Sequence, residues 1–169
     1  MTVPVRRVDV RPGGRADAYT QVMTARWQIE FCETADGRAP VEEWLLRLAP
    51  TKRRAAAAAL EMVLAVDGLA VCATPWGKHL GQALLEFRIR HTESEIRGIR
   101  GEETAGPAIP GSTSRAEAVL RRFFCHAHGN RVILLLAAYD KGRDPSAKRE
   151  QREIAEARRR LREFRRRGR

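Results

Sequence analysis

The sequence predicts an α+β fold in which one small, mainly antiparallel sheet packs against helices. Four segments show the alternation or the continuous apolar run that is typical of strands. The last three of these strands follow one another along the chain, and Gly129-Asn130 between the final two indicates a tight antiparallel hairpin. Three further segments repeat apolar residues at helical spacing, so helices are expected to cover the sheet.

The first strand is expected at residues 26–33, where aromatic and aliphatic residues alternate with polar ones. Asp36-Gly37 then indicates a turn, and Pro40 suits the first position of a helix. Pro50 is expected to end this helix. Its apolar residues share one face: Val41, Trp44, Leu45 and Leu48.

A second helix is expected from Thr51, which can cap it, to about Asp67, with Gly68 placed to stop it. The two helices, joined at Pro50 and Thr51, are typical of a helical hairpin. The predicted buried face of the second helix consists of Ala56, Leu60, Val63 and Leu64.

Residues 84–91, 119–127 and 131–139 are predicted to form the remaining strands. The continuous apolar run of the last one indicates a central strand with both faces covered. In the first one, alternation places Leu85, Phe87 and Ile89 toward the core. It places Glu86, Arg88 and Arg90 outward.

A last helix is expected to begin with Asp144 as its cap and Pro145 at its first position. Arginines fill most of its surface. One apolar stripe runs along it: Ile154, Ala157, Leu161 and Phe164.

The length of 169 residues fits one domain with appendages. Residues 1–25 lack periodicity and contain several prolines and glycines, so we expect a flexible arm before a domain at 26–169. Residues 92–117 are polar and predict a mobile insertion in that domain. No stretch approaches 18 uncharged apolar residues, and residues 1–25 lack the apolar block of a signal peptide. These observations predict a cytoplasmic protein.

The formal net charge is +11, which favours a polyanionic partner such as nucleic acid, an acidic protein or a membrane surface. The alternative is that the charge only keeps the protein soluble. Residues 141–169 contain thirteen Lys or Arg and five Asp or Glu, so they carry eight of the eleven net charges. This end of the chain fits a solvated helix face, a nucleic-acid arm or a helix that a partner displaces.

Side chains suited to phosphate chemistry lie along the predicted sheet: Lys78, Arg88, Arg122, His126, Tyr139 and Lys141. If the strands are neighbours, their outward face is a concave cationic surface on which only Glu86 and Asp140 are acidic. RNA cleavage beside a 2′-hydroxyl needs a base, an acid and cations that stabilise the phosphorane, and these residue types supply all three. The alternative is a solvated sheet face with surface arginines. Five further arginines are candidates for binding RNA: Arg90, Arg121, Arg158, Arg162 and Arg165.

The sequence contains no P-loop, GxGxxG, HExxH or GxSxG pattern, which argues against the commonest nucleotide-binding, zinc-protease and hydrolase mechanisms. Its three cysteines include no CxxC pair, so neither a disulfide framework nor a cysteine-rich zinc site is expected. In Cys125-His126-x-His128, strand alternation places the cysteine opposite both histidines. We therefore expect no metal and no cofactor.

Four segments, taken in order, resemble the RelE/ParE superfamily of bacterial toxins, in its phage-derived HigB-like branch. They are RWQIEFCETADGRAPVEEWLLRL, WGKHLGQALLEFRIR, RRFFCHAHGNRVILLLAAYDKG and PSAKREQREIAEARRR. The resemblance covers residues 26–166 except the insertion. It implies a RelE-like toxin of a type II toxin–antitoxin pair, with a small sheet, an N-terminal helical hairpin and a C-terminal helix.

In this family, RelE and HigB members cut mRNA in the ribosomal A site without a metal, and a helix-turn-helix antitoxin neutralises them. Lys78 matches the lysine before the second strand, Arg88 the arginine of that strand, and Arg122 the arginine of the third strand. Arg121 takes the place of Arg122 if the register slips by one. Lys141 matches the first lysine of a terminal pair.

The resemblance implies roles for these residues. Arg88 and Arg122 would bind the scissile phosphate. Lys78 or His126 would act as the base, and Lys141 or Tyr139 near the leaving group. The chain departs from the family pattern at Gly142, at Ala137 and Ala138, and at Phe124, where a lysine, a histidine and a tyrosine are common.

The sequence therefore leaves three candidate functions. The first is a ribosome-dependent mRNA endonuclease toxin with an antitoxin, the ribosome and mRNA as its partners. The second is a ParE-type toxin that poisons DNA gyrase. The third is a non-catalytic module that binds nucleic acid or an antitoxin. The lysine and arginine residues on the predicted sheet favour the first, because gyrase poisoning needs no phosphate-cleaving site.

Overall fold

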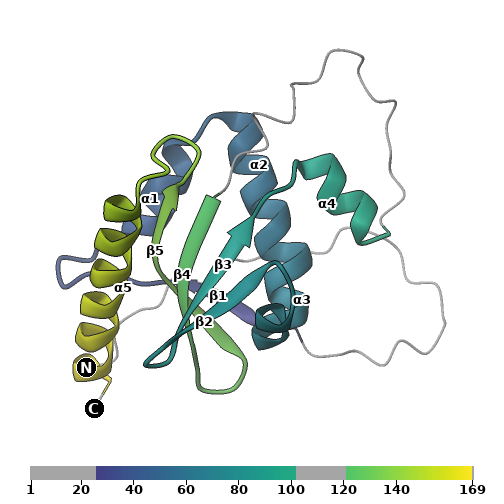
Figure 1. The fold of residues 1–169 in the computed structure, drawn as a ribbon. Helices are drawn as coiled ribbons and strands as arrows, with labels where there is room; N and C mark the ends of the chain where they lie inside the picture. The colour runs from purple at the N-terminus through teal and green to yellow at the C-terminus, as the bar shows by residue number, and fades with distance from the viewer. Residues whose placement is uncertain (1–25, 102–120, 169) are drawn as a thin grey trace.

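The computed structural model describes residues 26–101 and 121–168. Five strands form one sheet in the order β1-β5-β4-β3-β2 (Figure 1). They are β1 (Gln28–Phe31), β2 (Gly77–Gly81), β3 (Leu84–Ile89), β4 (Arg121–His128) and β5 (Val132–Asp140). β1 runs parallel to β5, and the other neighbouring strands are antiparallel. The predicted α+β class with a mainly antiparallel sheet is confirmed.

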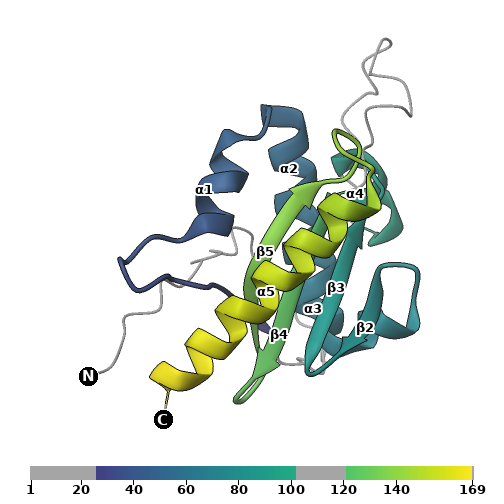
Figure 2. The same ribbon diagram turned by 60° about the vertical axis from the view of Figure 1, so that its left-hand side comes forward.

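Helices cover both faces of this sheet. Figure 2 shows α5 (Ala147–Arg167) crossing one face, with α1 (Pro40–Arg47) and α2 (Pro50–Ala59) behind the strands. One apolar core joins α1 and α2 to the sheet, and a second, smaller core joins α5 to it. Glu86 was predicted to face outward, but α5 covers that face of the sheet. Glu86 is therefore buried and does not face solvent.

The N-terminal helices begin as predicted at Pro40, but Pro50 is the first residue of α2 and Thr51 is not its cap. The helical run continues through a π-helical turn (Leu60–Leu64) and α3 (Ala65–Asp67) into a 3-10 helix (Gly68–Ala73). Gly68 has φ +55°, and a Cβ there would lie 2.0 Å from the Trp27 indole. Glycine is required at this bend for both reasons. The predicted buried face of the second helix is confirmed.

Among the described residues, one helical run, Pro50–Ala73, is long and apolar enough to cross a membrane by length and composition alone. Its most apolar window is 61% buried inside the structure. A small globular domain whose apolar helix is packed in this way is consistent with a soluble protein.

Two elements were not predicted. β2 forms a hairpin with β3 through Gln82 and Ala83, which both have the positive φ of a two-residue hairpin turn. α4 (Glu93–Ile99) lies in the segment expected to be a mobile insertion, and Thr92 and Glu95 form a capping box at its start. The remainder of that segment, residues 102–117, lies outside the described residues, as does the expected arm at 1–25.

α5 begins two residues later than predicted. Ser146 is its cap and accepts a hydrogen bond from the Arg149 amide at 3.2 Å, whereas Asp144 accepts one from the Ser146 amide at 3.1 Å. The predicted apolar stripe is confirmed, since it forms the helix side of the second core. β5 is covered on both faces as expected, but the middle strand of the sheet is β4.

Candidate active site

Three of the predicted site residues are lateral neighbours on the face that α5 covers. Arg88 of β3 is the register partner of Arg122 of β4, and Arg122 is the partner of Tyr139 of β5. Register partners are about 5 Å apart and point to the same side, so their side chains form one row. Lys141 follows β5 directly and joins this row through a carboxylate described below. We name Arg88, Arg122 and Lys141 the cation cluster.

Glu86 holds the strand side of the cation cluster. Both Nε and Nη2 of Arg88 donate to its Oε2, at 3.0 and 2.8 Å, and Nη1 of Arg122 donates to its Oε1. The Glu86 side chain is only 1% exposed. A carboxylate this deeply buried is stable only when it is paired, so Glu86 fixes the orientation of both arginines.

Glu150, in the first turn of α5, holds the other side of the cluster. Its Oε1 accepts from Arg122 Nη1 at 2.9 Å. Its Oε2 accepts from Lys141 Nζ at 2.7 Å and from the Tyr139 hydroxyl at 3.4 Å. The side chain is 22% exposed. Two arginines, a lysine and a tyrosine are thus gathered around two carboxylates.

The sequence predicts Glu86 and Asp140 as the acidic residues of this face, and this prediction is wrong in two respects. Glu150 was not expected here, and Asp140 lies on the other face, where it pairs with Lys52 of α2 at 2.8 Å. The sequence did contain a signal for Glu150. It lies four residues before Ile154 and seven before Ala157, so the apolar stripe of α5, extended by one turn, reaches it.

The environment sets the protonation states of two of these groups. Burial raises the pKa of Glu150, but the hydrogen bond from Lys141 and the charge of Arg122 outweigh it and hold the pKa below its ordinary value of 4.5. Burial and the nearby Glu150 charge raise the pKa of Tyr139 above its ordinary value. At neutral pH, Glu150 is therefore ionised and Tyr139 keeps its proton.

Lys78 lies beside the cluster but is not bound into it. It is the register partner of Glu86 on the edge strand β2, and its side chain is exposed. None of the ion pairs recorded between described residues includes Lys78. An incoming ligand can therefore meet this ammonium directly from solvent.

His126 shares the face of Arg122 but lies four residues further along β4, which is about 13 Å. Its Nδ1 lies 2.8 Å from the Ala83 carbonyl oxygen, and its ring stacks on His128. Burial lowers the pKa of His126, and the Arg165 charge lowers it further. The structure does not bring His126 together with the cation cluster, so it is not placed to share a substrate with Arg122.

The alternation predicted for Cys125-His126-x-His128 is confirmed. Cys125 belongs to the core under α1 and α2, while both histidines lie on the α5 side. Within residues 26–101 and 121–168, no group of three or more His, Cys, Asp and Glu side chains could hold a metal ion.

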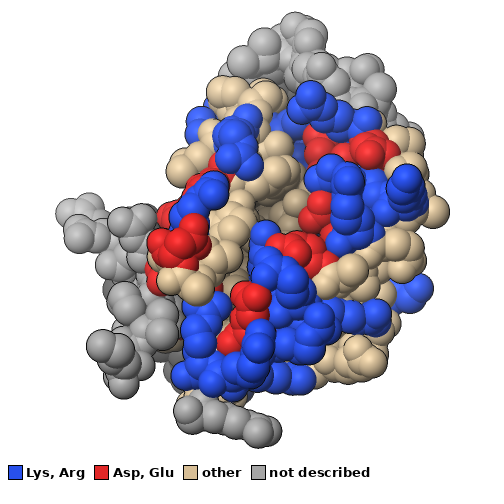
Figure 3. Space-filling model, turned by 90° about the vertical axis from the view of Figure 1, so that its left-hand side faces the viewer, with Lys and Arg blue, Asp and Glu red and all other residues tan. Residues whose placement is uncertain are grey.

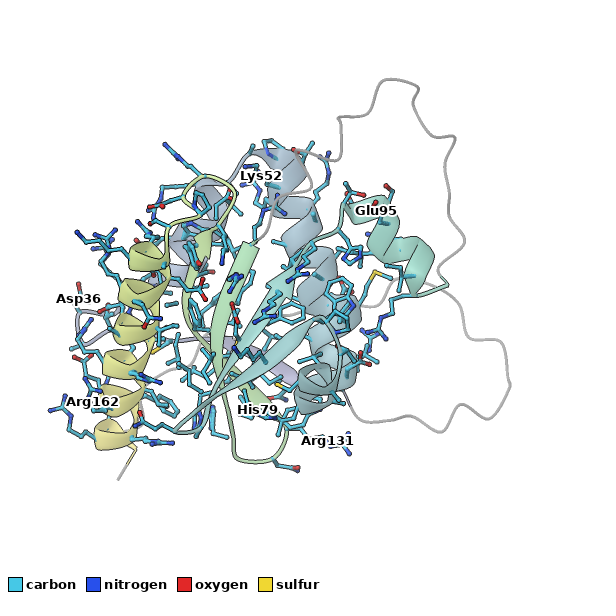
Figure 4. The ribbon with its side chains drawn as sticks, in the orientation of Figure 1. Asp36, Lys52, His79, Glu95, Arg131 and Arg162 are labelled. Atoms are coloured by element: carbon cyan, nitrogen blue, oxygen red, sulfur yellow. The ribbon has the colours of Figure 1, made fainter. Side chains whose placement is uncertain are left out.

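The five arginines predicted to bind RNA differ in their accessibility. Arg90 follows β3 and is exposed. Arg121 is buried on the α2 side, so Arg122, and not Arg121, shares a face with Arg88. Arg158 donates to the Leu80 carbonyl at 3.3 Å. Arg162 and Arg165 are exposed on α5, and Figure 4 shows Arg162 on the side of the helix that points away from the sheet.

The α5 side of the molecule is strongly basic. Figure 3 looks onto this side and shows Lys and Arg side chains over much of it, with Asp and Glu side chains among them. Some of these cations are paired within the helix, as Arg159 is with Glu156 and Glu163. The exposed arginines of α5 are Arg152, Arg159, Arg162, Arg165 and Arg166.

Comparison of the chain with family models, with curated proteins and with solved structures found no match. The function of this protein is therefore inferred from its own residues.

Proposed function

We propose that this protein cleaves RNA at the cation cluster and acts as the ribosome-dependent mRNA endonuclease of a type II toxin–antitoxin pair. One observation carries the proposal: Arg88, Arg122 and Lys141 come from different parts of the chain and meet with Tyr139 on one face. The order of segments that resembles the RelE/ParE superfamily supports it. A cytoplasmic location and a helix-turn-helix antitoxin as partner belong to the same proposal.

The proposed chemistry uses only side chains at and beside the cluster. The two guanidinium groups bind the scissile phosphate and stabilise the charge that develops on the phosphorane. Lys78, which is open to solvent beside them, is the candidate base for the 2′-hydroxyl. Tyr139 keeps its proton at neutral pH and is, with Lys141, a candidate acid for the leaving oxygen.

The test is induction of the protein in a bacterial host, followed by mapping of mRNA 5′ ends. We expect growth arrest and new cuts at fixed positions within codons. Arg88→Gln and Arg122→Gln should abolish both, whereas Arg54→Gln, which removes an exposed arginine of α2 that pairs with Glu93, should leave both unchanged. Unchanged growth and unchanged 5′ ends, in protein shown to be folded, would exclude the nuclease. Intact mRNA with a DNA-damage response and altered supercoiling would indicate a gyrase poison.

A specific observation favours a second candidate, the non-catalytic module. All three members of the cation cluster are already paired with Glu86 or Glu150. If these ion pairs are purely structural, the protein binds its partners elsewhere. In that case the Arg88→Gln and Arg122→Gln proteins, where they fold, should produce the same phenotype as the wild type.

A further inference from the structure

We propose that Glu150 occupies the place of the scissile phosphate, so that the cation cluster binds RNA only after the first turn of α5 has withdrawn this carboxylate. The inference rests on the proposed function for the identity of the ligand, a phosphodiester of RNA. It adds that Glu150 competes with that ligand for the cation cluster.

The contacts of Glu150 are those that a phosphodiester would make. A carboxylate and a phosphodiester each carry one negative charge, shared by two oxygens that accept hydrogen bonds. One Glu150 oxygen accepts from Arg122 at 2.9 Å, and the other accepts from Lys141 at 2.7 Å and Tyr139 at 3.4 Å. These three donors are residues that the sequence predicts for phosphate chemistry.

The two carboxylates at the cluster differ in how easily they can leave. Glu86 is 1% exposed and lies within a strand that has partners on both sides, so it moves only if the sheet opens. Glu150 is 22% exposed and is the fourth residue of a 21-residue helix. The first turn of a helix has the fewest backbone hydrogen bonds and opens most readily. Glu150 is thus the replaceable anion and Glu86 the fixed one.

Charge balance supports the same assignment. With both carboxylates in place, the cation cluster has one positive charge in excess. Withdrawal of Glu150 leaves two, together with the exposed ammonium of Lys78 next to them. A phosphodiester carries the same charge as the Glu150 carboxylate that it replaces. The arginines therefore need not be left buried without an anionic partner.

A role for Glu150 as the catalytic base fits the contacts less well. A base needs a free lone pair directed at the substrate hydroxyl. Both oxygens of Glu150 already accept hydrogen bonds from cationic side chains. The two roles make opposite predictions, because loss of a base slows cleavage whereas loss of a competitor strengthens binding.

The experiment measures binding of a 2′-O-methyl trinucleotide, which retains the phosphodiesters but has no free 2′-hydroxyl and is not cleaved. Glu150→Gln keeps the shape of the side chain and removes its charge, so we expect its Kd to fall by about tenfold. The matched control is Glu156→Gln, which removes the same charge from α5 about two turns later, where the recorded partners of Glu156 within the described part of the chain are arginines of the same helix. Its Kd should stay that of the wild type.

A second measurement uses the wild-type chain and is independent of how the variants fold. Hydrogen exchange at amides 150–154 should become faster when the trinucleotide saturates the protein, because the first turn of α5 must open. Exchange that is unchanged or slower overturns the inference. So does a Glu150→Gln protein that binds no tighter than the wild type, or the absence of trinucleotide binding by both.

The outcomes also separate this inference from the proposed function. Tighter binding by Glu150→Gln, with no new mRNA 5′ ends in a host that expresses either protein, would support the competitor and exclude the nuclease. Cleavage that is lost in Glu150→Gln, with unchanged trinucleotide affinity, would support the nuclease and assign Glu150 as its base.

Discussion

Glu86 and Glu43 show how differently a carboxylate contributes to stability when it is buried and when it lies at the surface of this protein. Glu86 is buried and accepts from two arginines of neighbouring strands. Glu43 pairs with Arg38 at the surface, where the two side chains are 32% and 64% exposed. The Coulomb energy of a surface pair is screened, whereas a buried arginine that loses its partner keeps the full cost of desolvation.

We therefore predict that Glu86→Gln lowers the free energy of unfolding by about 3 kcal/mol. Urea denaturation is the measurement. Glu43→Gln is the control and should change the free energy of unfolding little, because solvent screens its ion pair. Equal effects of the two substitutions would show that the arginines at the cluster gain little from Glu86.

Some features of single residues could be predicted from the sequence. Pro40 begins a helix and Gly68 directly follows the last α-helical residue, Asp67, because the conformations of proline and glycine are set by their own covalent structure. The burial of Glu86 could not be predicted in this way. Alternation assigns it to a face of the strand, but whether that face meets water depends on α5, about sixty residues later.

At the scale of elements, α5 is attached to the sheet by polar bonds as well as by its apolar stripe. Arg160 donates to the Leu136 carbonyl at 2.6 Å, Arg158 to that of Leu80 at 3.3 Å, and Arg167 to that of Glu33 at 2.9 Å. Several arginines that contribute to the predicted affinity for a polyanion thus hold the helix in place. Composition gives the number of charges, but only the packed helix shows which arginines are bonded within the fold.

The environment of His126 is expected to make the stability of the fold dependent on pH. The folded-state pKa of His126 is lowered, chiefly by burial and further by the charges of Arg165 and His128. Below its ordinary pKa of 6.5, the unfolded chain takes up this proton more readily than the folded one. The stabilising contribution is therefore complete above pH 6.5 and is lost as the pH falls.

We predict that the free energy of unfolding decreases as the pH is lowered from about 7 to about 5, and that His126→Gln makes this decrease shallower. Chemical denaturation across this pH range measures it. His79→Gln, on the exposed edge strand β2, is the matched control and should keep the wild-type slope. A slope that His126→Gln does not change would assign the pH dependence to other groups.

Two elements illustrate the limits of periodicity. β2 begins and ends with glycine and has no alternation, and it is a strand because β3 supplies its hydrogen-bond partners. α4 did carry a local signal, the capping box of Thr92 and Glu95, within a segment whose polar composition predicted a loop. A helix of seven residues is marginal alone, and the ion pairs Arg54–Glu93 and Asp67–Arg100 tie it to the helices before it.

At the scale of the whole molecule, the charge of +11 divides into cations that are engaged in the fold and cations that are free to meet a partner. Arg160 is engaged, since it bonds the Leu136 carbonyl and pairs with Glu156. Arg162, two residues later, lies on the outer side of α5. Only cations of the second kind release counterions from a nucleic acid when it binds.

We predict that RNA binding weakens steeply with salt, and that Arg162→Gln lowers the slope of log K against log salt concentration by about 1. Titration of a labelled oligoribonucleotide at several salt concentrations measures this slope. Arg160→Gln should leave the slope unchanged and lower stability instead. Binding that does not respond to salt would show that the basic surface has no part in RNA contact.

The sequence by itself determined the helix that begins at Pro40, the presence of a second helix after it, most strands, the stripe of α5 and the sheet residues that could handle phosphate. These follow from local rules, in which periodicity and turn residues act within a few positions. The tertiary structure decided that α5 covers the predicted outward face, and that Arg122 meets Glu86 and Glu150, which are 36 and 28 residues away. Such partners are set by strand order and helix docking, and no local pattern in the chain encodes them.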